Sequence, residues 1–141
     1  MSGASPPRES RILVVDDDPD ITIYLASFLE DRGFCVRTSQ SAASALAEME
    51  PFRPDVVLVD VLMPGRSGLD LLVTLRGDPR WSNLTLVVMT GMDRILQEDC
   101  HSYLGSHREV HGPDAVLGKP IDTDTLLLVL ERLTAEKRAC L

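Results

Sequence analysis

The stretch VVLVDVLMPGRSGLDLL, residues 56–72, shows a pattern that recurs along the chain. Residues 56–59 are continuously apolar, as expected for a strand that is covered on both faces of a parallel sheet. The turn-forming residues MPG follow at 63–65. Leu69 and Leu72 are then three positions apart, which is a helical spacing. The stretch therefore predicts a strand, a turn and a helix, in that order.

Five apolar runs occur along the chain, three of them continuously apolar, and most are followed by a turn and a segment with helical spacing. They lie at residues 12–15, 34–37, 56–59, 84–89 and 115–117. Repeated β/α units joined by right-handed crossovers predict an α/β fold, with a doubly wound, five-stranded parallel sheet and helices on both faces. The segment from Met92 to His111 has no clean apolar stripe, so its helix is the least regular of the set.

Capping residues mark the ends of several predicted helices. Asp18 and Pro19 are typical of the N-cap and the first position of a helix, and Gly33 is typical of a helix stop. The thin apolar stripe of the second helix ends before Pro51. An acidic turn at residues 122–124 precedes the last helix.

The chain has 141 residues and a formal net charge of −8, from 22 acidic and 14 basic side chains. This length suits one domain; we expect a disordered leader over residues 1–10, a folded domain over 11–135 and a C-terminal tail over 136–141, with no output domain after the last helix. The acidic balance argues against direct binding to nucleic acid. Because no apolar run is long enough to cross a membrane or to form a signal peptide, we expect a cytoplasmic protein.

Charged and polar side chains stand at the carboxyl ends of the predicted strands, where ligands bind in sheets of this kind. Asp16 and Asp17 follow the first run, Asp60 and Thr90 end the third and fourth strands, and Lys119 follows the fifth. Crowded carboxylates repel one another unless a cation neutralises them. With so few protein ligands, Mg²⁺ completed by water and a phosphate oxygen suits these residues better than Ca²⁺.

One carboxylate beside such a metal ion can act as a nucleophile on phosphorus. The attack forms an acyl phosphate, and the developing charge needs the metal, an ammonium group and a hydroxyl or amide donor around the phosphoryl oxygens. Lys119 and Thr90 carry groups of these types. The residue types therefore favour Mg²⁺-dependent phosphoryl transfer to an aspartate.

These motifs resemble the receiver domain of bacterial two-component response regulators. The matching residues are Asp16 and Asp17 after ILVV, Asp60 within VVLVDVLMPGRSGLDLL, Thr90 followed by Gly91, and the dipeptide of Lys119 and Pro120. The spacing agrees as well, since Asp60 lies 43 residues after Asp17 and Thr90 lies 30 residues after Asp60. The resemblance covers roughly residues 11–135 and implies a flavodoxin-like sheet with strand order 2-1-3-4-5.

The resemblance implies a role for each acidic residue. Asp60 would accept a phosphoryl group from the phosphohistidine of a histidine kinase. Asp16, Asp17 and Asp60 would hold Mg²⁺, for which Mn²⁺ can substitute, and the backbone carbonyl of Leu62 would be a further ligand. The domain would be no enzyme in the usual sense, because it would catalyse only its own phosphorylation and dephosphorylation.

The resemblance also implies how the phosphoryl group is held and sensed. Lys119 would contact the phosphate and the Asp60 carboxylate, and its bond to Pro120 would be cis. Thr90, with Gly91 beside it, would move toward the phosphoryl group and change the face made by helix 4, strand 5 and helix 5. The partners would be a sensor histidine kinase or phosphotransfer protein, a downstream output protein or domain, and a second copy of the chain in a homodimer.

Three features depart from the family pattern or add to it. The position three residues before Lys119, where the family has an aromatic switch residue, is Val116, so the signal would pass mainly through backbone and loop movement. Leu128 lies off the apolar stripe of the last helix and, with Val116, marks a candidate partner surface. Lys119 lies 29 residues after Thr90, several more than in typical receivers, and the extra length falls in residues 93–111.

Two other functions fit part of the pattern. A haloacid-dehalogenase-like phosphatase also uses an aspartate nucleophile, a threonine, a lysine and Mg²⁺, and Asp16 and Asp18 do form a D-x-D. That family needs a later acidic pair at the end of another strand, whereas Asp122 and Asp124 follow Lys119 too closely. The other alternative is a degenerate receiver that acts as a protein-interaction module without phosphorylation, and the complete set of site residues argues against it.

Overall fold

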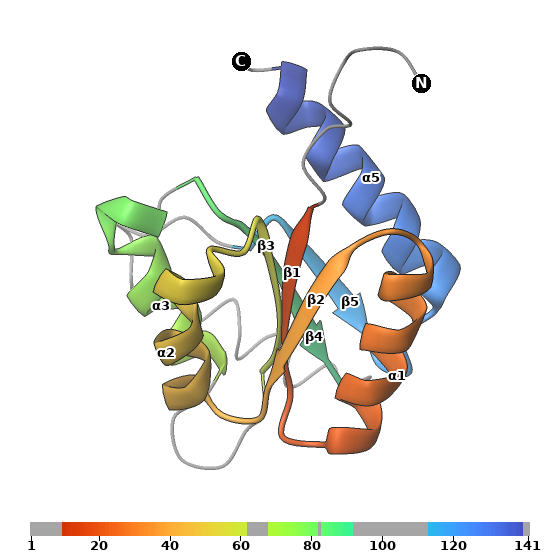
Figure 1. The fold of residues 1–141 in the computed structure, drawn as a ribbon, viewed down its shortest axis with the longest axis horizontal. Helices are drawn as coiled ribbons and strands as arrows, with labels where there is room; N and C mark the ends of the chain where they lie inside the picture. Colours follow the sequence, from red (N-terminus) through yellow and green to blue (C-terminus); the bar gives the residue numbers. More distant parts are fainter. Residues whose placement is uncertain (1–9, 62–67, 82, 92–112, 140–141) are drawn as a thin grey trace.

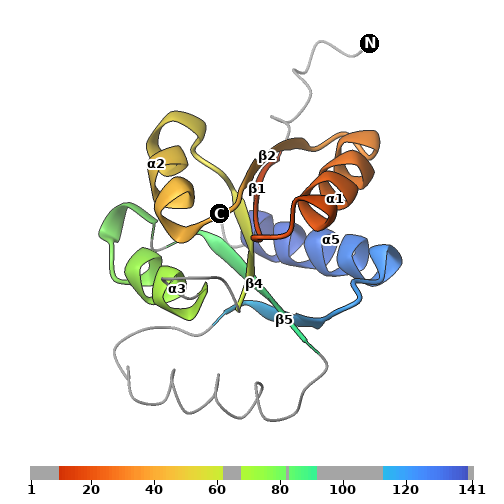
Figure 2. The same cartoon turned by 90° about the horizontal axis from the view of Figure 1, so that it is seen from below.

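The computed structural model of the chain describes residues 10–61, 68–81, 83–91 and 113–139. Its elements are β1 (Arg11–Val15), α1 (Pro19–Asp31), β2 (Cys35–Ser39), α2 (Ala42–Phe52), β3 (Val56–Asp60), α3 (Gly68–Arg76), the short 3-10 helix η1 (Pro79–Trp81), β4 (Thr85–Thr90), β5 (Ala115–Gly118) and α5 (Thr123–Ala139). The strands are parallel and lie in the order β2-β1-β3-β4-β5. Helices α1 and α5 cover one face of the sheet and α2 and α3 cover the other (Figures 1 and 2). The predicted fold and strand order are confirmed.

The three central strands are buried on both faces, because successive side chains of a strand point to opposite sides of the sheet. In β1, Ile12 and Val14 join the core beneath α1 and α5. Leu13 and Val15 join the core beneath α2 and α3. β3 and β4 divide their side chains in the same way. Each of these buried side chains contributes roughly 1.5–3 kcal/mol to folding, which explains why the runs are continuously apolar.

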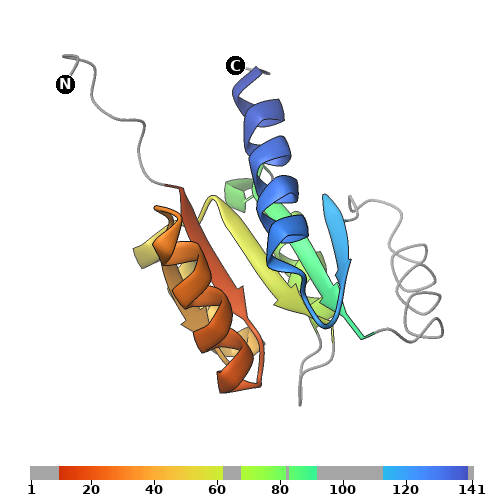
Figure 3. The same ribbon diagram turned by 90° about the vertical axis from the view of Figure 1, so that its right-hand side faces the viewer.

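Helix α1 begins and ends at the residues that the capping pattern predicted. The Asp18 side chain accepts a hydrogen bond of 3.0 Å from the backbone N–H of Asp20, and Pro19 is the first residue of the helix. Beyond its end, Gly33 has a φ of +93°, a left-handed conformation that glycine adopts without steric cost. Figure 3 shows α1 lying beside α5 over the same face of the sheet.

Helix α2 extends beyond the end of its predicted apolar stripe, through Pro51 to Phe52. Proline in the last turn costs one backbone hydrogen bond. Two interactions outweigh this loss. The ring of Phe52 is buried, with the guanidinium of Arg37 5.0 Å from its centroid. The N–H of Arg53, in a left-handed conformation, also donates to the Met49 carbonyl oxygen at 2.9 Å.

The last helix is longer than expected. Leu126, Leu130 and Leu133 are buried as its apolar stripe predicts. The helix continues to Ala139, four residues beyond the expected end of the folded domain, through residues of good helix propensity. The predictions for the leader at residues 1–9 and for the long segment at 93–111 lie outside the described residues. None of the helices in the described part of the chain is long and apolar enough to cross a membrane.

A partly buried ion pair ties α3 to the segment that enters β5. The guanidinium of Arg76, whose side chain is 6% exposed, donates to Asp114 Oδ2 at 2.7 Å and to the carbonyl oxygen of Leu84. Asp114 Oδ2 also accepts a hydrogen bond of 2.8 Å from the N–H of Leu86 in β4. The carboxylate of Asp114 therefore satisfies two donors from two different elements.

We predict that Asp114→Ala destabilises the fold by roughly 2–4 kcal/mol, because it removes the negative charge that pairs with a buried guanidinium and the acceptor of the Leu86 N–H. Glu48→Ala is the control. Glu48 also forms an ion pair, with Arg37 at 2.8 Å, but the two side chains are 33% and 51% exposed, and we expect a change of at most about 0.5 kcal/mol. Urea unfolding followed by Trp81 fluorescence measures both values. Equal effects of the two substitutions would contradict the prediction.

Candidate functional site

Four strands of the fold bring five polar side chains to one edge of the sheet. The strands run downward in Figure 1, so their carboxyl ends face the reader in Figure 2. Asp16 and Asp17 follow β1, and Asp60 is the last residue of β3. Thr90 is the last residue of β4, and Lys119 follows β5. The order of the strands places β1 and β3 side by side, which brings residues distant in sequence together.

Three carboxylates form a compact acidic cluster, made of Asp16, Asp17 and Asp60. One oxygen atom from each lies within 4.8 Å of the others. Asp16 has no exposed surface and Asp60 is 5% exposed, whereas Asp17 is exposed. An all-oxygen donor set of this kind, open on one side, suits a hard divalent cation that keeps several water ligands. The sequence predicted that these three residues would meet.

The ammonium group of Lys119 lies between two of the carboxylates. Its Nζ is 2.8 Å from Asp16 Oδ2 and 3.0 Å from Asp60 Oδ2. Burial by itself would lower the pKa of Lys119, but the hydrogen bonds to Asp16 and Asp60 outweigh burial and raise this pKa above its usual value. Lys119 therefore carries its positive charge at neutral pH. The peptide bond between Lys119 and Pro120 is cis.

Three hydrogen bonds hold Asp16 in position. Its Oδ1 accepts a hydrogen bond of 3.0 Å from the N–H of Asp18, while Oδ2 binds Lys119. Its own N–H donates to the carbonyl oxygen of Ser39, at the end of β2, at 3.0 Å. The contact between Lys119 and Asp16 was not predicted. The two residues are 103 positions apart, and nothing in the sequence distinguishes Asp16 from Asp60 as a partner of Lys119.

Thr90 differs from the other site residues in the state of its hydroxyl. It is 3% exposed, and its Oγ1 has no hydrogen-bond partner among the residues that the structure describes. Buried hydroxyls are normally bonded, so this one is an available donor beside the site. The carbonyl oxygen of Thr90 accepts a bond of 2.7 Å from the N–H of Lys119. Gly91 follows Thr90 and is partly exposed, and Leu62 lies outside the described residues.

The remaining candidate residues lie outside the acidic cluster. Asp122 accepts bonds from the N–H of Asp124 at 3.2 Å and from the hydroxyl of Thr125 at 2.8 Å, as a residue that caps α5 does. This pair therefore does not supply the second acidic pair that a dehalogenase-like phosphatase needs. Val116 is 49% exposed and Leu128 is 67% exposed, as a partner surface requires.

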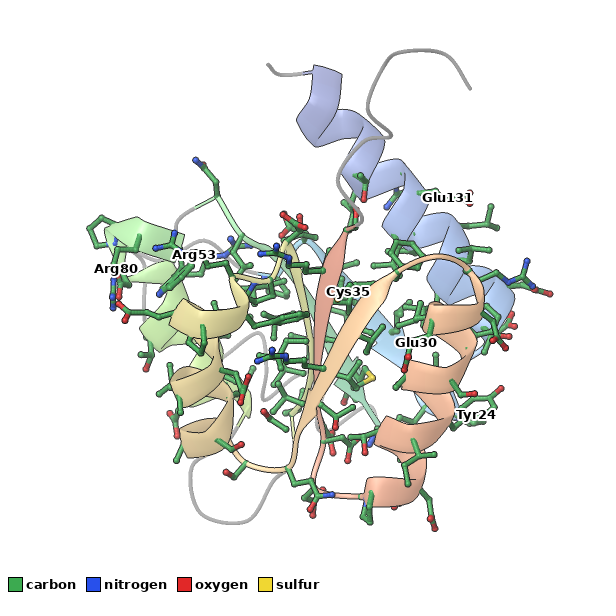
Figure 4. The ribbon with its side chains drawn as sticks, viewed as in Figure 1. Tyr24, Glu30, Cys35, Arg53, Arg80 and Glu131 are labelled. Atoms are coloured by element: carbon green, nitrogen blue, oxygen red, sulfur yellow. The ribbon has the colours of Figure 1, made fainter. Side chains whose placement is uncertain are left out.

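The structure also shows two exposed apolar side chains that the sequence did not single out. Ile23 and Tyr24, on α1, are 65% and 56% exposed. Figure 4 shows Tyr24 on the side of α1 that faces away from the sheet. Both residues occur within the amphipathic pattern of α1. Their exposure depends on how the helix is rotated about its axis when it packs on the sheet, and the pattern does not determine this rotation.

Comparisons with known proteins agree with this geometry. The model of the response regulator receiver domain family matches residues 12–131. Protein PilH of Pseudomonas aeruginosa is 30% identical over 126 residues, which cover 89% of this chain and 98% of the relative. Response regulator Rre1 of Synechocystis sp. is 34% identical over 135 residues, covering 91% of this chain and 53% of the relative. A solved structure of a putative response regulator from Chloroflexus aurantiacus is similar with a TM-score of 0.79 and 26% identity, over 91% of this chain and 99% of that chain.

The relatives differ in length. The chain spans nearly all of PilH, about half of Rre1 and a quarter of the nitrogen assimilation regulatory protein NtrX of Azorhizobium caulinodans. What these proteins have in common with the chain is the domain with the five-stranded sheet. The matched residues 12–131 include Asp16, Asp60, Thr90 and Lys119. On this evidence, the chain belongs to the family of response regulator receiver domains.

Proposed function

We propose that the chain is a phosphoacceptor receiver domain that takes a phosphoryl group from the phosphohistidine of a sensor histidine kinase or phosphotransfer protein onto Asp60. The observation that carries this proposal is the contact of Lys119 Nζ with both Asp16 and Asp60, at 2.8 and 3.0 Å, inside the acidic cluster. This contact places a permanent positive charge beside the carboxylate that would react. The folded domain over residues 11–135 would act as a signalling module in the cytoplasm and not as an enzyme that turns over a separate substrate.

A divalent cation completes the proposed site. Asp16, Asp17 and Asp60 would hold Mg²⁺, or Mn²⁺ in its place, with the backbone carbonyl of Leu62 as a further ligand. When bound, the ion would neutralise part of the negative charge on the incoming phosphoryl group. The donor set supports this assignment because it consists of oxygen atoms and because its three negative charges exceed the single positive charge of Lys119.

The proposed reaction needs a nucleophile and donors to the phosphoryl oxygens. A carboxylate oxygen of Asp60 would attack phosphorus, the bond to the kinase imidazole would break, and an acyl phosphate would form. Lys119 would bind one phosphoryl oxygen, and the free hydroxyl of Thr90 would donate to another. The Thr90 hydroxyl has no hydrogen-bond partner among the described residues, so this bond would replace none that those residues make.

The same groups would convey the signal. A movement of Thr90 toward the phosphoryl group would pull on the end of β4, which is joined to Lys119 by the bond between its carbonyl oxygen and the Lys119 N–H. The exposed side chains of Val116 in β5 and Leu128 in α5 would form part of the surface that responds. A downstream output protein or domain, or a second copy of the chain, would bind there. Val116 is not aromatic, so backbone movement would carry the change.

We predict that the protein incubated with phosphoramidate and Mg²⁺ gains the mass of one phosphoryl group, measured by intact mass spectrometry. Asp60→Asn should abolish the gain, because an amide oxygen is a poor nucleophile and forms no acyl phosphate. Asp31→Asn, at the far end of α1, is the control and should be phosphorylated like the unchanged protein. A mass gain that persists in Asp60→Asn would refute the assignment of Asp60. Steady release of phosphate from a phosphate monoester would instead favour the alternative function of a haloacid-dehalogenase-like phosphatase.

We predict that Lys119→Met binds Mg²⁺ more tightly, on the order of fivefold, because a positive charge next to the ion has been removed. The same substitution should slow phosphorylation, since the ammonium group would no longer face the phosphoryl oxygens. Isothermal titration calorimetry measures the affinity for Mg²⁺, and a time course of intact mass spectra measures the rate of phosphorylation. Lys119→Arg keeps the charge and should leave the affinity for Mg²⁺ within about twofold. Weaker binding of Mg²⁺ by Lys119→Met would argue against the proposed ion site.

A further inference from the structure

We propose that Gly68, the first residue of α3, is a positioning residue for Asp60. Because Gly68 has no side chain, the start of α3 packs directly against the peptide group of the phosphoacceptor. This inference rests on the proposed function, in which the carboxylate of Asp60 must meet Lys119 and the metal ion. The sequence indicated Gly68 only as the residue before an apolar stripe.

The space beside Gly68 is filled by the backbone of Asp60. A β-carbon at this position would lie 2.0 Å from the Asp60 carbonyl oxygen, 2.8 Å from its carbonyl carbon and 3.1 Å from Val59 Cγ2. Two of these atoms belong to the backbone and cannot rotate away as the end of a flexible side chain could. Any residue other than glycine must therefore displace either the start of α3 or the end of β3.

The end of β3 has little freedom to move. Asp60 is paired with Met89 in β4, and the next residue, Val61, donates its N–H to the Met89 carbonyl oxygen at 3.0 Å. The carbonyl oxygen of Val61 in turn accepts the N–H of Gly68 at 3.1 Å. The neighbouring strand and the helix therefore hold the N–H and the carbonyl group of Val61, directly after Asp60, and a shift there would also shift the Asp60 carboxylate.

Helix α3 is anchored as well. Leu71, Leu72 and Leu75 are buried in the core beneath α2 and α3, with at most 1% of each exposed. At the other end of the helix, Arg76 is bonded to Asp114 and to the Leu84 carbonyl oxygen. Since neither element is free, a side chain at position 68 would be accommodated by small shifts of both. Part of that shift would fall on Asp60 and change the contact of 3.0 Å between its Oδ2 and Lys119 Nζ.

A shift of this kind should affect the reaction more than the binding of the ion. Asp16 and Asp17 belong to a different strand end and would keep their positions, so most of the affinity for Mg²⁺ should remain. Phosphoryl transfer requires close alignment of the attacking oxygen, and misplacement by about 1 Å can cost on the order of a hundredfold in rate. Gly68→Ala should therefore lower the rate of phosphoryl transfer and leave the affinity for Mg²⁺ nearly unchanged. A general loss of stability would lower both.

The test compares Gly68→Ala with Gly118→Ala. A β-carbon at Gly118, the last residue of β5 and the neighbour of Lys119, would meet no atom of the described residues within 4 Å. At saturating Mg²⁺ we expect Gly68→Ala to react with phosphoramidate at least about tenfold more slowly than the unchanged protein, with an Mg²⁺ affinity within about threefold. Gly118→Ala should match the unchanged protein in both. The fluorescence of Trp81, the single tryptophan and 9% exposed, measures the folded fraction of each variant. Each reaction rate is divided by this fraction.

If Gly68→Ala is partly unfolded, the rate is measured in trimethylamine N-oxide, which favours the folded state. A rate per folded molecule within twofold of the unchanged protein would overturn the inference. A rate and an Mg²⁺ affinity that fall together would overturn it too. Failure of the proposed function has a different signature: the unchanged protein would then gain no phosphoryl group, or Asp60→Asn would gain one.

Discussion

Repulsion among three carboxylates, relieved in part by one ammonium group, is the interaction around which the functional edge of this domain is organised. Asp16 is completely buried, and a buried charge is costly unless it is paired and hydrogen-bonded. Lys119 satisfies one of its oxygens and the N–H of Asp18 satisfies the other. Among the described residues of the cluster the negative charges still exceed the positive charge, and this excess is what favours a divalent cation and, with it, a phosphoryl group.

The scaffold beneath this edge holds the proposed phosphoacceptor, Asp60, and the proposed sensing residue, Thr90, in different ways. Asp60 ends a central strand that is paired on both sides, and the first residue of α3 packs against its carbonyl group. Thr90 ends the next strand, but its hydroxyl has no partner in the described part of the chain. In the proposed function, this arrangement would suit a switch, because a bond from Thr90 to a phosphoryl group would break none that the described residues make.

Most of the secondary structure could be predicted because its signals are local. Continuous apolar runs mark the buried strands, and Asp18, Pro19 and Gly33 mark the two ends of α1. The end of α2 could not be predicted. A proline normally stops a helix, and here the burial of Phe52, which depends on how the helix packs on the sheet, carries the helix one residue past Pro51.

The residue types of the site and their spacing were already evident in the amino-acid sequence, because an apolar strand followed by an acidic residue is a local pattern. Which of these residues touch was decided by the folded structure. The contact of Lys119 with Asp16 joins strand ends 103 residues apart. The need for glycine at position 68 arises from the backbone of Asp60 in a neighbouring element. Both depend on distances across the sheet, and such distances exist only after the strands have paired and the helices have packed.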